Sequence, residues 1–166
     1  MQIETWRGDI TELDVDAIVN AANPQLAPGG GVCGAIHAAA GPQLAEACAE
    51  LTPCATGDAV ATDGFELPAR WVIHAVGPRW GAEDGDEEAL LGSAYRRSVE
   101  VADELGATSI AFPSISTGIY GFPAPLAASI AVATLRSLKP STVRRCVLVA
   151  FDDDSLALLD AALADG

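Results

Sequence analysis

Short apolar segments that alternate with helical patterns restrict the fold of this chain more than any other feature. The segments at 71–76, 109–112 and 146–151 are apolar along almost their whole length, without regular alternation of apolar and polar residues. Strands of this kind are buried on both faces, as in a parallel sheet that helices cover on either side. The pattern therefore predicts an α/β fold, a three-layer α/β/α sandwich around a central mixed, mostly parallel sheet.

The rest of the chain continues this alternation without a repeat or a long linker, so residues 1–166 are expected to form a single domain. Further strands are expected at 2–7, 16–20 and 58–63. The helical patterns run through IHAAAG and PQLAEACAEL to Leu51, over about 87–105, from near Pro123, and over 153–164.

The balance of charge limits the kinds of partner. The chain has 23 acidic and 9 basic residues, which give a net charge of −14 at pH 7. Nucleic acids and membrane surfaces attract proteins mainly through lysine and arginine, so neither is an expected partner. No apolar run reaches the roughly 18 residues that span a bilayer. The first ten residues also lack the basic start and apolar stretch of a secretory signal, so a cytoplasmic location is expected.

The cysteines show no metal-binding pattern. Cys33, Cys48, Cys54 and Cys146 form no CxxC pair and are expected to be free thiols in a reducing compartment. Cys33 and His37 lie one helical turn apart, but no further ligands accompany them. We therefore expect no metal ion and no other cofactor.

Two glycine-containing loops each follow a predicted strand and precede a predicted helix. The first is PGGGVCG at 28–34, and the second is SISTGIYG at 114–121. Ligands of such sheets bind at the carboxyl ends of strands, and free amide groups at the start of a helix bind anions. Neither loop has the Walker pattern or the GxGxxG spacing. Because neither loop contains lysine, we expect them to hold a diphosphate mainly through backbone amides.

Six blocks of the sequence extend over nearly the whole chain: GDIT (8–11), DAIVNAAN (16–23), GGGVCGAIH (29–37), AAG (39–41), VIHAVGP (72–78) and AFPSISTGIYGFP (111–123). Together these blocks resemble the macrodomain family. The resemblance implies a protein that binds ADP-ribose. Within the family the chain is most similar to the branch that removes ADP-ribose from proteins or deacetylates O-acetyl-ADP-ribose.

The resemblance also implies roles for individual residues. Asp9 would accept a hydrogen bond from the adenine amine, Ile10 would donate a backbone N–H, and Phe151 would lie beside the adenine. Asn23 would bind the distal ribose, and Tyr120 would pack on it. The diphosphate and distal ribose would lie between Gly30, Gly31, Val32 and Cys33 on one side and Ser116, Thr117, Gly118 and Ile119 on the other.

Each of these residues also has an alternative structural role. Asp9 can cap the turn before Thr11, and Asn23 can form a side-chain turn before Pro24. Tyr120 and Phe151 can be core aromatics. Two further polar residues are interpreted as structural: Asn20 as a support for the loop at the end of its strand, and His74 as a buried strand residue.

Position 33 departs from the family's pattern. Hydrolases of the family commonly carry an aspartate ten residues after the ribose asparagine, where this chain has Cys33. The resemblance implies that this aspartate orients or activates the attacking water, as a general base does.

Several interpretations of Cys33 stay open. A water held by the α-phosphate and Asn23 can attack without a side-chain base. The chain can instead be a reader that binds ADP-ribose without hydrolysis. Cys33 can itself act as a thiolate. A different nucleotide, such as ADP-ribose 1″-phosphate, is a further alternative. The expected partners are ADP-ribose, its esters and ADP-ribosylated proteins, and a monomer is expected because no segment offers an interface stripe.

Overall fold

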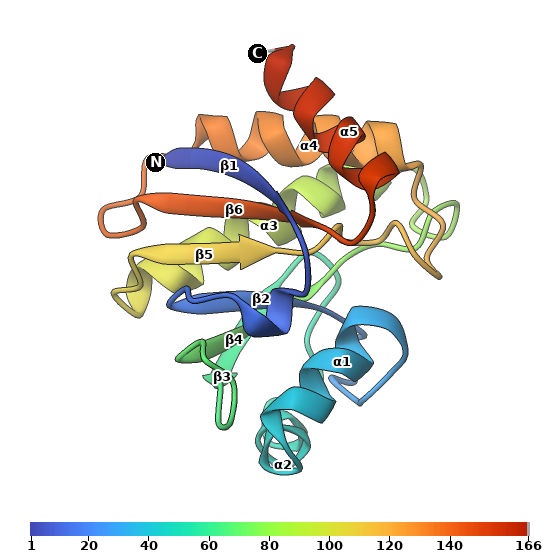
Figure 1. Ribbon diagram of the computed structural model, residues 1–166. Coiled ribbons are helices and arrows are strands. Elements are labelled where there is room, and N and C mark those ends of the chain that lie inside the picture. The colour runs from blue at the N-terminus through green and yellow to red at the C-terminus, as the bar shows by residue number, and fades with distance from the viewer. Residues whose placement is uncertain (166) are drawn as a thin grey trace.

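The computed structural model, which describes residues 1–165, contains a six-stranded sheet with helices on both faces (Figure 1). The strand order is β1-β6-β5-β2-β4-β3, and every neighbouring pair is parallel except β3 and β4. The predicted sandwich with a mixed, mostly parallel sheet is thereby confirmed. The strands are β1 (Gln2–Arg7), β2 (Ala17–Ala22), β3 (Ala59–Asp63), β4 (Trp71–Val76), β5 (Ser109–Phe112) and β6 (Arg145–Ala150).

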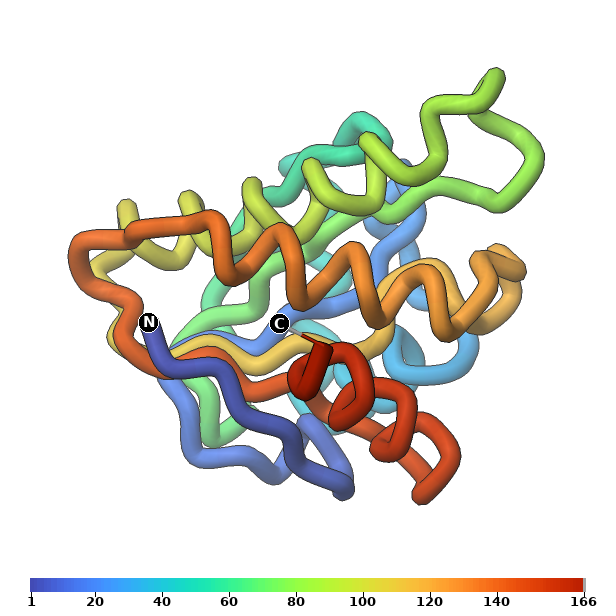
Figure 2. The backbone as a smooth tube through the Cα atoms, turned by 90° about the horizontal axis from the view of Figure 1, so that it is seen from above, coloured from blue at the N-terminus to red at the C-terminus, as the bar shows by residue number. Residues whose placement is uncertain are grey.

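The helices divide into two layers, each with its own apolar core. The helices are α1 (Gly31–Ala40), α2 (Gln43–Ala49), α3 (Glu87–Glu104), α4 (Ala124–Ser137) and α5 (Asp153–Ala164), and a 3-10 turn, η1, spans Ile10–Glu12. One core lies between the sheet and α3, α4 and α5, and the other between the sheet and α1 and α2. Figure 2 shows α3 and α4 side by side over one face of the sheet. Within residues 1–165, no helix is both long and apolar enough to cross a bilayer.

The helical pattern that ends at Leu51 forms two helices, α1 and α2. Gly41 follows α1 with a φ of +91°, a conformation that favours glycine, and its N–H donates to the carbonyl of His37. Pro42 comes next and has no N–H to continue the helical ladder. The chain therefore turns between the two helices at these residues.

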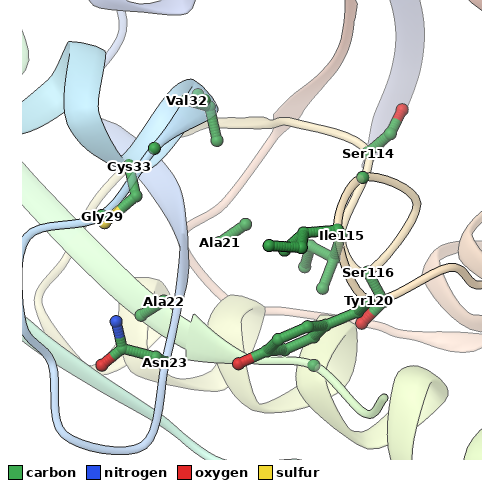
Figure 3. A pocket seen from close by; sticks show the side chains of 15 residues that line it. Ala21, Ala22, Asn23, Gly29, Val32, Cys33, Ser114, Ile115, Ser116 and Tyr120 are labelled. Atoms are coloured by element: carbon green, nitrogen blue, oxygen red, sulfur yellow. The ribbon is translucent and has the colours of Figure 1, made fainter. Parts of the chain in front are cut away.

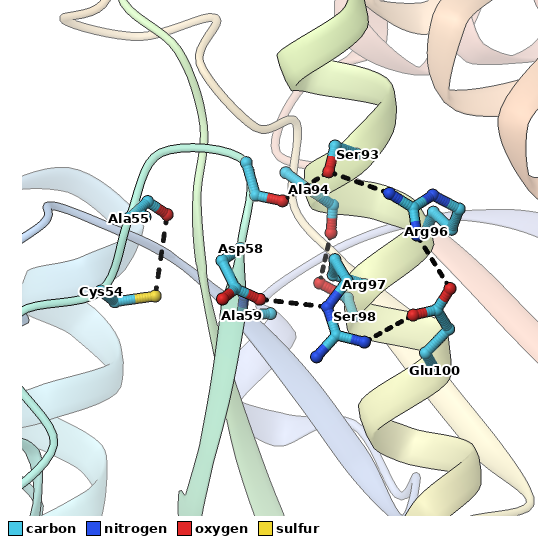
Figure 4. Close-up of polar contacts among 11 residues, drawn as sticks. Cys54, Ala55, Asp58, Ala59, Ser93, Ala94, Arg96, Arg97, Ser98 and Glu100 are labelled. Atoms are coloured by element: carbon cyan, nitrogen blue, oxygen red, sulfur yellow. Dashed lines mark hydrogen bonds and ion pairs between the residues drawn. The ribbon is translucent and has the colours of Figure 1, made fainter.

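Arg97 of α3 connects this helix to the start of the edge strand β3 (Figure 4). Its Nε donates to Asp58 at 3.1 Å, and its Nη1 donates to Glu100 at 2.5 Å. The hydroxyl of Ser93 donates to the carbonyl of Gly57 at 2.8 Å. The contacts to Asp58 and Gly57 hold the start of β3, the edge strand that runs antiparallel to its neighbour, against α3, whereas Glu100 belongs to α3 itself.

Candidate functional site

A cavity of about 460 Å³ opens at the carboxyl ends of β2, β4 and β5 (Figure 3). These strands are parallel neighbours in the sheet, so the loops that follow them meet at one edge. The loop after β2 and the start of α1 form one wall, and the loop after β5 forms the opposite wall. The lining residues are Ala21, Ala22, Asn23, Gly29, Gly30, Gly31, Val32, Cys33, Gly77, Ser114, Ile115, Ser116, Gly118, Ile119 and Tyr120.

None of these lining residues, all of which lie within the described residues 1–165, is charged. The cavity lining thus differs from the chain as a whole, which has a net charge of −14. A carboxylate in the wall would repel a bound anion, and none is present there. The polar groups that remain are hydroxyls, one carboxamide, one thiol and the backbone.

The first wall ends in the amino terminus of α1. Gly30 is the N-cap residue of the helix and has an extended conformation; because it is a glycine, it has no side chain that could bond to the first N–H groups. Gly31 has a φ of +59°. The first N–H groups of a helix have no partner inside the helix, and the helix dipole adds positive potential at this end. Gly34 packs against the loop so closely that an added Cβ would lie 2.5 Å from the carbonyl oxygen of Gly29. This wall is therefore built for an anion that contacts backbone amides.

Asn23 lies in the wall and also holds the loop together. Its Nδ2 donates to the carbonyl of Ala27, and its Oδ1 accepts from the N–H of Ala27, both at 3.0 Å. A carboxamide has two N–H groups and an oxygen with two lone pairs, so Asn23 keeps one donor and one acceptor for a ligand. The side chain thus fits both the predicted ligand role and the structural alternative, because it braces the loop.

Cys33 lies in the first turn of α1, with only 6% of its surface exposed. Its Sγ accepts from Nδ2 of Asn20 at 3.6 Å and lies 3.8 Å from the carbonyl of Ala27. All four cysteines are free and buried, but only Cys33 lines the cavity. Burial raises the pKa of Cys48 and Cys54 to about 11 and that of Cys146 to about 12, so these three thiols stay protonated at neutral pH.

Hydrogen bonds within the chain hold the second wall, the loop at 114–122, in a closed turn. Ser116 has a φ of +68°, and its carbonyl accepts from the N–H of Phe122 at 2.9 Å. The N–H of Trp80 donates to the carbonyl of Tyr120 at 2.9 Å, and the Trp80 ring packs edge-on against Phe122. The Oγ of Ser116 is buried and has no partner among residues 1–165. It is therefore a polar group without a partner in the cavity wall.

The predicted residues of this loop differ in where they lie. Figure 3 shows the ring of Tyr120 extending from the loop toward Asn23. Ile119 is fully exposed at the rim. The side chain of Thr117 lies instead beside a small hollow next to α4 and α5, and its hydroxyl donates to the carbonyl of Ser114 at 3.1 Å. The structure thus brings Tyr120 and Ile119 to the cavity, but not the Thr117 side chain.

Asp9, Ile10 and Phe151 lie outside the cavity lining but at the same edge of the sheet. Asp9 and Ile10 follow β1, Phe151 follows β6, and the N–H of Gly8 donates to the carbonyl of Ala150 at 3.0 Å. Phe151 is 79% exposed, so it is not a core aromatic. Asp9 caps η1, because its Oδ1 accepts from the N–H of Thr11 at 2.9 Å. Its other carboxylate oxygen is free to accept from a ligand.

The sequence patterns did not identify several lining residues. Ala21, Ala22 and Gly77 lie at the ends of β2 and β4, and Ile115 precedes the strained Ser116. Their positions at strand ends were the available signal, since binding sites gather there in sheets of this type. Within residues 1–165, no group of three His, Cys, Asp or Glu side chains is arranged to hold a metal ion.

Comparisons with known proteins identify relatives along almost the whole chain. The family model described as Macro domain matches residues 19–131. A macro domain-containing protein of Chlorobaculum tepidum is 51% identical over 166 residues, covering 99% of this chain and 96% of that protein. A protein of Enterobacter cloacae named O-acetyl-ADP-ribose deacetylase is 49% identical over 169 residues, covering 98% of this chain and 93% of the relative.

Solved structures are also similar. An Oceanobacillus iheyensis macrodomain with ADP superposes with a TM-score of 0.93 at 40% identity, covering 97% of this chain and 89% of that one. A Trypanosoma brucei macrodomain in complex with ADP-ribose superposes with a TM-score of 0.90 at 38% identity, covering 97% of this chain and 68% of that one.

Proposed function

This chain belongs to the macro domain family, and from that premise we propose that its cavity binds ADP-ribose. The uncharged cavity wall is the observation that carries the proposal. Backbone amides at the start of α1 can bind a diphosphate without a basic side chain, and no carboxylate in the wall opposes them. The structures of the Oceanobacillus iheyensis and Trypanosoma brucei relatives, with ADP and ADP-ribose, support this choice of ligand.

In this proposal the ligand lies along the carboxyl edge of the sheet. The adenine binds near Asp9, Ile10 and Phe151, which follow the neighbouring strands β1 and β6. The distal ribose binds near Asn23 and Tyr120, which face each other across the cavity. The diphosphate lies between these two ends, beside the first turn of α1.

Isothermal titration calorimetry with ADP-ribose tests this proposal. We expect a dissociation constant in the micromolar range, a free energy of about −8 kcal/mol. Adenosine is the matched control ligand, because it keeps the adenine contacts and lacks the diphosphate. The absence of heat at millimolar ADP-ribose would refute the proposal.

We further propose that the protein hydrolyses ADP-ribose esters. The deacetylase name of the Enterobacter cloacae relative supports this activity. The reaction consumes one water, breaks one ester bond, and releases ADP-ribose and the free acid. Among the groups that line the cavity, no carboxylate or imidazole is available as a general base. The attacking water is therefore held by Asn23 and by the α-phosphate of the substrate, which takes the place of a side-chain base.

A non-catalytic reader is the second candidate, and Cys33 is the observation that favours it. The thiol stands where the family's hydrolases commonly carry an aspartate, and losing a general base typically lowers rates by about 10²–10⁴-fold. A reader would bind ADP-ribose through the same wall and release it unchanged.

A time course decides between the two candidates. The pure protein is incubated with O-acetyl-ADP-ribose and, separately, with protein-linked glutamyl-ADP-ribose, beside the Asn23→Ala variant. Release of ADP-ribose that the variant abolishes supports the enzyme. Tight binding without release identifies a reader. Unchanged turnover in the variant would show that Asn23 does not hold the water.

A further inference from the structure

A series of buried polar side chains leads from the cavity wall into an otherwise apolar layer. Asn20 on β2 and His74 on β4 are register partners in the sheet, 1% and 0% exposed. The core around them, between the sheet and α1 and α2, consists of aliphatic residues and cysteines. Buried polar groups destabilise a fold unless they are hydrogen-bonded, so their contacts need to be traced.

Asn20 and His74 connect β2 and β4 to three further elements of the fold, α1, α2 and β3. One N–H of the Asn20 carboxamide points to Nδ1 of His74 at 3.1 Å, and the same nitrogen lies 3.6 Å from Sγ of Cys33. Nε2 of His74 lies 2.9 Å from Oγ1 of Thr62 and 3.6 Å from Sγ of Cys48. The polar contacts thus run from Thr62 through His74 and Asn20 to the thiol in the cavity wall.

The donors and acceptors of these contacts fix the state of the imidazole. Burial lowers the pKa of His74 to about 4, so the ring is neutral at pH 7. A carboxamide nitrogen can only donate, so Nδ1 must carry no hydrogen. The single ring hydrogen is then on Nε2, which donates to Thr62.

The orientation of the Asn20 carboxamide is coupled to this tautomer. With Nδ1 as an acceptor, the Nδ2 group of Asn20 faces both His74 and Cys33, while Oδ1 has no partner among residues 1–165. Rotation of the carboxamide by 180° would exchange the two atoms and turn an acceptor toward Cys33. That orientation requires the ring hydrogen on Nδ1 instead.

We propose that His74, as the Nε2–H tautomer, is a positioning residue that fixes the Asn20 carboxamide so that an N–H group faces position 33 of the cavity wall. The N–H stabilises negative charge on the group at position 33, which in this chain is the Cys33 sulfur. His74 touches no part of the cavity itself and acts only through Asn20. Any effect of this positioning of Asn20 on turnover rests on the proposed function. The tautomer of His74 and the reactivity of the Cys33 thiol do not depend on it.

The tautomer can be read directly in the wild-type protein. The chain contains two histidines, so ¹⁵N-labelled histidine gives two sets of ring signals, and a His37→Gln variant assigns them. We expect His74 at pH 7 to be the Nε2–H form. A Nδ1–H form would overturn the proposal, because Asn20 would then present its oxygen to both neighbours. This measurement does not depend on any variant of His74 folding.

The reactivity of Cys33 tests the effect on the cavity. His74→Gln keeps an acceptor for Asn20 and a donor for Thr62, whereas His74→Leu removes both. We expect alkylation of Cys33 by iodoacetamide at pH 7 to slow at least about threefold in His74→Leu, the loss of one weak hydrogen bond, and to stay near the wild-type rate in His74→Gln. Mass spectrometry of the Cys33 peptide gives the rate, and Cys33→Ala is the control. An unchanged or faster rate in a folded His74→Leu variant would overturn the proposal.

Calorimetry with ADP-ribose on the same samples separates this proposal from the proposed function. Because His74 does not line the cavity, its variants should bind ADP-ribose with the wild-type dissociation constant, within about twofold. If even the wild-type protein gives no heat, the proposed function fails while the tautomer and alkylation results stand. If the protein binds ADP-ribose but His74 is the Nδ1–H form, only the positioning role fails.

Discussion

Replacing Gly34 with alanine tests whether the loop at 28–34 holds the ligand. The added Cβ would lie 2.5 Å from the carbonyl oxygen of Gly29, whereas carbon and oxygen atoms in weak contact are about 3.3 Å apart, so about 0.8 Å must be gained. The Cβ would be fixed to the backbone of α1, and the oxygen belongs to the backbone of the preceding loop, so no side chain can rotate away. The loop that carries Gly29, Gly30 and Gly31 must therefore move.

The expected effects on stability and binding differ in size. Overpacking costs about 1–3 kcal/mol, while alanine is favoured over glycine in a helix by about 1 kcal/mol, so the free energy of unfolding falls by at most about 2 kcal/mol. A displaced loop loses at least one hydrogen bond to a charged phosphate, about 1.5–3 kcal/mol, which raises the dissociation constant for ADP-ribose roughly 10- to 150-fold.

Calorimetry and thermal unfolding of the Gly34→Ala variant give both quantities. The matched control is Gly92→Ala in α3, where the new Cβ meets the Thr134 hydroxyl at 3.3 Å, on a side chain that can rotate, and Cγ2 of Ile130 at an ordinary contact distance of 3.9 Å. The control should bind ADP-ribose like the wild type. If Gly34→Ala is folded and also binds with the wild-type dissociation constant, the loop at 28–34 does not hold the diphosphate.

Three further predictions follow from individual contacts. Asp9→Ala should weaken ADP-ribose binding by about 1–3 kcal/mol, and Asp9→Asn, which keeps an oxygen to cap Thr11, should weaken it less; equal affinities in calorimetry would exclude Asp9 as the adenine ligand. Arg97→Ala should lower the free energy of unfolding in urea by about 0.5–1 kcal/mol, since its ion pairs with Asp58 and, within α3, with Glu100 are partly exposed. No change would show that the pair with Asp58 does not hold the edge strand against α3. Backbone N–H groups of Thr142 and Ser141 lower the pKa of Asp103 from 3.8 to about 2, so its carboxylate stabilises the fold fully above about pH 4 and loses this effect as the pH falls toward 2. Asp103→Asn should therefore destabilise the protein at pH 7 and much less near pH 2, and a pH-independent difference in thermal unfolding would contradict this origin.

The sequence predicts the strands well because burial on both faces leaves a local signature. Residues 71–76 and 109–112 are apolar along almost their whole length, and both form strands within those bounds. The end of β2 was missed, because Ala21 and Ala22 carry no β signature and are strand only through pairing with β4. Local patterns of this kind indicate where the cavity lies, since each wall is a contiguous loop that follows a strand.

Contacts between distant segments leave no such signature. The interpretation of His74 as a buried strand residue agrees with its burial, but its bond to Asn20 joins residues 54 positions apart, and its bond to Thr62 depends on the antiparallel register of β3. The role of Thr117 is a comparable case. The motif places it beside the ligand, whereas the tight turn after Ser116 directs its hydroxyl back to Ser114.

The surroundings of position 33 suit an anion at least as well as a thiol. An amide N–H of Asn20 points at this position, and the first turn of α1 adds positive potential there. We therefore expect Cys33→Asp to fold with little loss of stability, since the new carboxylate meets a donor already in place. In an active enzyme the variant should hydrolyse O-acetyl-ADP-ribose faster, because it gains a general base, by up to about 10²-fold. Unchanged turnover would show that the water is held by the substrate and Asn23 alone. New activity in a previously inactive protein would identify Cys33 as the one residue that makes this chain a reader.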